Sequence, residues 1–127
     1  MFLATMLVSM LLVTSCSDDD EWEAMKWTTS SEITKGNEVA VPTEGAAYSF
    51  KCDNYKWVKL NLCSEDGVEV KITSDDKIER EWGVIECKDN VLGVTFNSNN
   101  SGKDRNVNVK VTAGNIFDSF TFKQKTN

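Results

Sequence analysis

The chain has 127 residues, of which 40% are hydrophobic and 27% charged, with one proline, seven glycines and no histidine. This length allows one domain, and so little proline and glycine excludes collagen-like or proline-rich disordered chains. The formal net charge is −6. A chain without a basic excess lacks the electrostatic field that phosphate backbones require, so nucleic acid is not an expected partner.

Residues 1–15 are predicted to be a secretory signal peptide. Residues 1–13 are apolar or small throughout, and this stretch is shorter than the roughly 20 residues that span a bilayer. The motif Val13-Thr14-Ser15-Cys16 resembles the bacterial lipobox, in which small residues precede a lipidated cysteine. The resemblance implies that Cys16 carries the lipid, becomes the new N-terminus and anchors the protein to a membrane through acyl chains.

Residues 16–30 are predicted to be an acidic tether that leads to a folded domain at 31–127. The run from Ser17 to Glu23 holds five acidic residues and no basic one, so residues 24–127 are almost neutral. Like charges keep such a segment extended and solvated. The run resembles the export signal of surface lipoproteins of the Bacteroidetes group, which implies an outer-membrane, cell-surface location. A plain soluble tether is the alternative.

Apolar and polar residues alternate with period two along most of the remaining chain, which is typical of half-buried strands. The apolar sets are, in chain order, Val39 and Val41; Tyr48, Phe50 and Cys52; Val58, Leu60 and Leu62; Val68, Val70 and Ile72; Leu92, Val94 and Phe96; Val107, Val109 and Val111; and Phe120 and Phe122. Turn-forming residues separate these sets at 43–45, 65–67, 97–102 and 113–115. The pattern predicts an all-β, immunoglobulin-like antiparallel β-sandwich of about seven to eight strands.

Two segments are ambiguous. Ile78, Trp82 and Ile85 fall at helical spacing, but residues 82–87 fit a short strand better. Trp27 and Ile33 belong either to a leading strand or to the tether.

The three cysteines other than Cys16 allow at most one disulfide within the chain. Cys52 and Cys63 are separated by a full strand length, which disfavours their pairing. A Cys52–Cys87 disulfide and three free, buried thiols both remain open. No CxxC motif and no histidine is present, so no zinc site is expected.

Catalytic chemistry has little support in the sequence. Histidine, the most common general base, is absent. The carboxylate pairs at 75–76 and 79–81 lie in a charged loop rather than across a cleft of the kind that glycosidases use. Residues 97–102 place oxygen-bearing side chains in a loop but lack the carboxylates that calcium prefers. We therefore expect no enzyme activity, no metal and no cofactor.

The segment LGVTFNSNNSGKDRNVNVKVTAGNIFDSFTFKQ, from Leu92 to Gln124, resembles the C-terminal half of the BACON domain, a Bacteroidetes-associated module often found in carbohydrate-active proteins. The matching features are the turn at Gly102, Arg105, the turn at Gly114 and the final Gln124. Upstream, residues 43–50 with the Gly45 turn, followed by Asn54 and Trp57, resemble the N-terminal half. The resemblance implies an immunoglobulin-like sandwich and a role near glycans. Arg105 is expected to fix its turn by bonding carbonyl groups or Asp104.

Four aromatic residues are candidates for ligand binding, because the flat faces of sugars stack on exposed rings. They lie near predicted turns or strand ends and are Tyr55, Trp57, Trp82 and Phe117. Core packing is the alternative for each ring. Two functions follow: a surface glycan-binding lipoprotein, or a structural or accessory domain that packs against an outer-membrane protein and binds no sugar.

Overall fold

The structure is a computed structural model that describes residues 23–29 and 37–127. The predicted signal peptide, the lipidation site Cys16 and Ile33 lie outside the described residues. In the described ranges, no helix is long and apolar enough to cross a membrane.

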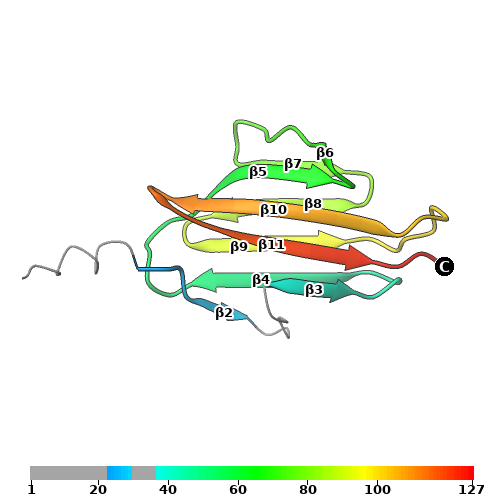
Figure 1. The fold of residues 1–127 in the computed structure, drawn as a ribbon, viewed down its shortest axis with the longest axis horizontal. Coiled ribbons are helices and arrows are strands. Elements are labelled where there is room, and N and C mark those ends of the chain that lie inside the picture. The colour runs from blue at the N-terminus through cyan, green and yellow to red at the C-terminus, as the bar shows by residue number, and fades with distance from the viewer. Residues whose placement is uncertain (1–22, 30–36) are drawn as a thin grey trace, which may run out of the picture.

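Ten strands in the described ranges form two five-stranded sheets (Figure 1). One sheet, named the β10 sheet here, has the order β3-β11-β10-β5-β6, and the other, the β9 sheet, has the order β2-β4-β9-β8-β7. The strands are β2 (Trp27–Thr29), β3 (Glu38–Val41), β4 (Ala46–Cys52), β5 (Lys59–Glu65), β6 (Val68–Glu69), β7 (Lys77–Arg80), β8 (Gly83–Lys88), β9 (Val91–Phe96), β10 (Arg105–Ala113) and β11 (Ile116–Gln124).

The pairing matches that of immunoglobulin domains. The strands β2-β4-β9-β8 correspond to one sheet of that fold and β5-β10-β11 to the other. Neighbouring strands pair antiparallel, except that β3 runs parallel to β11. The predicted all-β, immunoglobulin-like sandwich is therefore confirmed. The strand expected at 82–87 is β8, which pairs with β7 as a hairpin.

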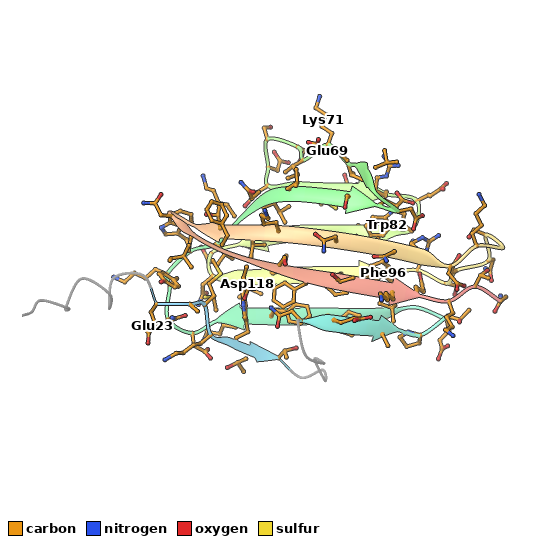
Figure 2. The ribbon with its side chains drawn as sticks, in the orientation of Figure 1. Glu23, Glu69, Lys71, Trp82, Phe96 and Asp118 are labelled. Carbon is orange, nitrogen blue, oxygen red and sulfur yellow. The ribbon has the colours of Figure 1, made fainter. Side chains whose placement is uncertain are left out.

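The core lies between the two sheets and consists of the inward half of the alternating residues. Phe50 from the β9 sheet packs on Phe120 from the β10 sheet, with ring centroids 4.7 Å apart, and both rings are fully buried. Trp82 stacks on Phe96 at 5.1 Å toward the opposite end of the sandwich from Asp118 (Figure 2). Burial of these large rings makes a large contribution to the hydrophobic stabilisation.

A β-bulge in β5 interrupts the alternation that the sequence predicted for Val58, Leu60 and Leu62. Val111 of β10 lies opposite Leu60, whereas Lys110 lies opposite Leu62, so Asn61 is the extra residue. A bulge reverses which side chains face inward. Leu62 is consequently 42% exposed, and the buried position passes to Cys63.

The strand predicted at 68–72 is also shorter than expected. β6 contains only two residues, and Val68 is 69% exposed. Val70 still bonds back to Cys63 through its backbone N–H and is buried. Beyond it the chain leaves the sheet for the loop that leads to β7.

The domain begins earlier than residue 31, the predicted boundary. Met25 is buried in the core, and Trp27–Thr29 pairs with β4. The Trp27 indole N–H donates to Asp118 at 2.9 Å, and its ring meets Phe120 edge-on at 5.1 Å. A three-residue strand is too short to show an alternation of apolar and polar residues. The sequence therefore did not decide whether Trp27 belongs to a leading strand or to the tether.

Candidate functional site

The candidate site is the solvent side of the β10 sheet, named the open face here. Every second residue of β10 and β11 is buried between the sheets. The residues between them point to solvent, because side chains alternate across a strand. The register places these outward side chains in rows across three strands. One row is Lys59, Thr112 and Phe117, and the next is Leu62, Lys110 and Ser119.

Two aromatic rings are exposed at one end of the open face. Phe117 is 54% exposed at the start of β11, and Trp57 is 47% exposed in the loop before β5. Trp57 precedes buried Val58 and lies two residues before the exposed Lys59, with which β5 begins. The β4–β5 connection and the β10–β11 turn lie at the same end of the sandwich (Figure 1).

The separation of these two rings follows from the sheet geometry. Phe117 lies two strands from Lys59, and Trp57 lies two residues before it. With about 4.8 Å between strands, the Cα atoms of Phe117 and Lys59 are about 10 Å apart, and Trp57 lies beyond Lys59 in the connection from β4. This distance is longer than one sugar ring, so the pair suits an extended chain of sugars.

Tyr55 holds the chain rather than presenting a free ring. Its ring packs against the core, and its hydroxyl donates to the carbonyl of Glu23. The side chain of neighbouring Asn54 accepts from the backbone N–H of Lys26 at 2.9 Å and donates to the carbonyl of Ala24 at 2.8 Å. Both residues thus fasten residues 23–26 to the β4–β5 loop, and the prediction of Tyr55 as a ligand-binding ring is corrected.

Trp82 is not available to a ligand either. It lies in the β7–β8 turn, where the sequence offered it as a candidate ligand-binding ring, but its side chain is only 2% exposed. The ring turns inward and stacks on Phe96, and its indole N–H donates to Glu65 at 2.9 Å. An apolar ring with a bonded polar tip is stable in a core. Trp82 therefore has a structural role.

The predicted turn glycines adopt positive φ angles, at +99° for Gly45, +87° for Gly102 and +69° for Gly114. L-residues with a side chain rarely occupy this region. At Gly45 space is also lacking, since a Cβ atom would lie 2.4 Å from the carbonyl oxygen of Phe96.

Arg105 has a different partner from the one expected. Its guanidinium donates to the side-chain oxygen of Gln124 at 2.7 Å, not to Asp104. Gln124 is almost fully buried, and its amide donates to the carbonyls of Pro42 at 3.0 Å and Asn97 at 2.8 Å. This residue therefore joins two loops to the end of β11. Sequence patterning marked its position but not its role.

Asn99 is a second buried polar residue that the sequence analysis missed. Its amide donates to the carbonyl of Lys103 at 2.9 Å, and its side-chain oxygen accepts from the Ser101 hydroxyl at 2.7 Å. Its backbone N–H bonds the carbonyl of Thr43 at 2.8 Å. The loop at 97–102 is thus organised around its own polar groups.

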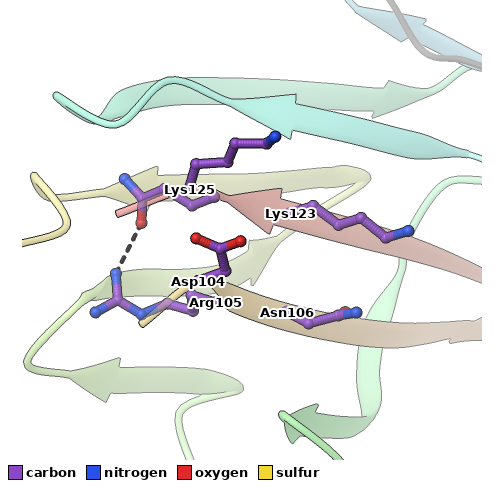
Figure 3. A pocket seen from close by; sticks show the side chains of 6 residues that line it. Asp104, Arg105, Asn106, Lys123 and Lys125 are labelled. Carbon is purple, nitrogen blue, oxygen red and sulfur yellow. Dashed lines mark hydrogen bonds between the residues drawn. The ribbon is translucent and has the colours of Figure 1, made fainter. Parts of the chain in front are cut away.

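A hollow of about 300 Å³ lies at the other end of β10 and β11 (Figure 3). Most of its polar side chains already have protein partners. Arg105 bonds Gln124, Lys123 pairs with Glu38 at 2.8 Å, and Asp104 accepts from the backbone of Thr126 at 3.1 Å. The hollow is therefore a weaker candidate than the exposed rings.

The three described cysteines are free and buried. Burial raises the pKa of Cys63 to about 11 and that of Cys87 to about 12, with smaller contributions from the Glu65 and Asp76 carboxylates respectively. Such thiols stay protonated and unreactive at neutral pH. Among the described residues, no group of three or more cysteine or carboxylate side chains is placed to hold a metal ion.

The fold defines the chain as an immunoglobulin-like β-sandwich, and known structures agree. The M1 domain from titin has a TM-score of 0.52 and 14% identity, covering 83% of this chain and 96% of that domain. A protein from Bacteroides thetaiotaomicron, solved by NMR, has a TM-score of 0.77 and 33% identity, covering 89% of this chain and 97% of that one. This chain belongs to the same family as that Bacteroides protein. No family model matches the chain, and no curated protein matches it.

Proposed function

We propose that this protein is a non-catalytic glycan-binding lipoprotein, whose ligand lies along the open face between Trp57 and Phe117. The exposure of these two rings, one in the β4–β5 connection and the other at the start of β11, at the same end of the sandwich carries the proposal. Burying rings of this size is strongly favourable, so a protein that leaves them in water has a contact surface for another molecule.

The surroundings of the rings suit a sugar. The exposed side chain of Asn61, at the β5 bulge, and the side chain of Ser119 offer hydrogen-bonding groups beside apolar surface. Binding sites for small molecules combine such apolar contact with a few polar groups. The resemblance of Leu92–Gln124 to the BACON domain also supports a role near glycans, and the relative from a Bacteroides species agrees with an origin in the Bacteroidetes group.

Affinity electrophoresis of the full chain in mild detergent tests the proposal, with gels that contain mucin or plant polysaccharides. Retardation by a glycan, lost in Trp57→Ala or Phe117→Ala, is the expected result. Val68→Ala is the control, because it truncates an exposed apolar side chain elsewhere in the β10 sheet. If no glycan retards the protein, the alternative of an accessory domain for an outer-membrane partner gains support.

The anchoring at the outer membrane is tested separately. Replacing Cys16 by alanine removes the thiol that would carry the lipid. The variant is expected to leave the membrane fraction, since acyl chains supply the attachment. A variant that stays with the membrane would contradict the lipid anchor but would not affect the proposed glycan site.

A further inference from the structure

Two lysines of the open face have no ionic partner in the described part of the chain. Lys59 on β5 and Lys110 on β10 both point to solvent, and neither side chain forms an ion pair or hydrogen bond in the described residues. Elsewhere on the same face, Lys123 is neutralised by Glu38 at 2.8 Å. The two lysines near the exposed rings thus differ from the third in lacking an acidic neighbour.

The register brings these two positive charges close together. Lys59 lies opposite Thr112, and Lys110 is two residues from Thr112 on the same strand. Diagonal neighbours of this kind are about 7–8 Å apart. Like charges at this separation repel each other, and an anion between them would relieve the repulsion.

Apolar side chains flank the two lysines. The rows that contain Lys59 and Lys110 also contain Phe117 and Leu62, and no acidic residue stands in either row. Lys110 therefore lies directly opposite the exposed Leu62, and Thr112 lies between Lys59 and the exposed Phe117. This pattern is complementary to a molecule that combines a flat carbon face with an anionic substituent.

We propose that the ligand of the open face is an acidic glycan. Its carboxylate or sulfate group lies between Lys59 and Lys110, while its sugar rings contact Phe117 and Trp57. The inference rests on the proposed glycan-binding function and narrows its ligand class. The net charge of −6 on the whole chain does not oppose it strongly, because charges more than about 8 Å away are screened at physiological salt.

The test compares polysaccharides that differ only in charge. Polygalacturonate and its carboxyl-reduced form probe the carboxylate, and dextran sulfate and dextran probe the sulfate, each in gels at about 0.15 M salt with the full chain. Two exposed ion pairs of about 0.5–0.7 kcal/mol each predict a preference of about five- to tenfold for a charged member over its neutral partner. Lys59→Gln combined with Lys110→Gln is expected to abolish that preference.

Lys51→Gln combined with Lys88→Gln is the matched control. These two exposed lysines lie on the opposite sheet, on either side of Val91, with Lys51 on β4 and Lys88 on β8. Replacing both removes two positive charges, as the test variant does. An equal loss in both double variants would show general electrostatic attraction and overturn the inference. Equal binding of charged and neutral polysaccharides would overturn it while leaving the glycan function intact. No binding to any polysaccharide, charged or neutral, would instead refute the proposed function itself.

Discussion

Replacing Gln124 by methionine should destabilise the fold more than any single exposed change near it. Its amide donates to the carbonyls of Pro42 and Asn97, and its oxygen accepts from Arg105. In the variant, the carbonyl of Pro42 still accepts from the backbone N–H of Gly45 at 2.9 Å. The carbonyl of Asn97, in contrast, loses the Gln124 amide that donates to it. Methionine has a similar size, so the change removes hydrogen bonds and leaves the packing nearly intact.

The magnitude follows from these contacts. An orphaned buried acceptor costs about 1–3 kcal/mol, and each ordinary hydrogen bond contributes about 0.5–1.5 kcal/mol. The half-exposed Arg105 side chain can hydrogen-bond to water instead, so the loss of its bond to Gln124 adds little to the destabilisation. The free energy of unfolding should therefore fall by about 2–4 kcal/mol, which lowers Tm by roughly 10–30 °C in a domain of this size.

Urea unfolding followed by tryptophan fluorescence measures this change. Lys125→Met is the control, because the exposed neighbouring residue should change stability by no more than about 0.5 kcal/mol. Gln124→Glu should also be less stable than the parent protein at pH 7, since it keeps an acceptor for Arg105 but removes the donor to the carbonyls of Pro42 and Asn97. A loss below about 1 kcal/mol for Gln124→Met would refute this reasoning.

Three further predictions concern backbone, core and thiols. Gly45→Ala should cost about 1–3 kcal/mol more than Gly102→Ala in urea unfolding, since both have positive φ but only Gly45 lacks space for a Cβ atom; equal losses would refute the steric argument. Trp82→Phe should lower the unfolding free energy by about 1–3 kcal/mol, because it removes the indole donor to a carboxylate; an unchanged Tm would contradict this. Cys63 and Cys87, with pKa values raised to about 11 and 12, should resist a thiol reagent at pH 8 until the protein unfolds. The unfolded thiols ionise near pH 9.0, so their contribution to the free energy of unfolding should be complete below that pH. It should be lost as the pH rises toward 11–12. The double variant Cys63→Ala, Cys87→Ala should not show this decrease in stability.

The exposed rings show where sequence reasoning about the site ended. Trp57 and Trp82 both stand near turns, and periodicity does not distinguish them. The structure separates them because Trp82 finds Phe96 to stack on and Glu65 to bond, whereas Trp57 has only solvent on one side. Whether a ring at a strand end is buried depends on its partners from the other strands, and these are distant in sequence.

The sequence alone determined most of the strands, their turns and the sandwich class, because alternation and turn chemistry are local properties of a chain. Its acidic segment and lipobox-like motif also led to the proposed surface location. Only the tertiary structure decided that the bulge exposes Leu62, that Gln124 joins distant loops, and that Lys59, Lys110 and Phe117 share one face. These features depend on register between strands, which local patterning does not encode.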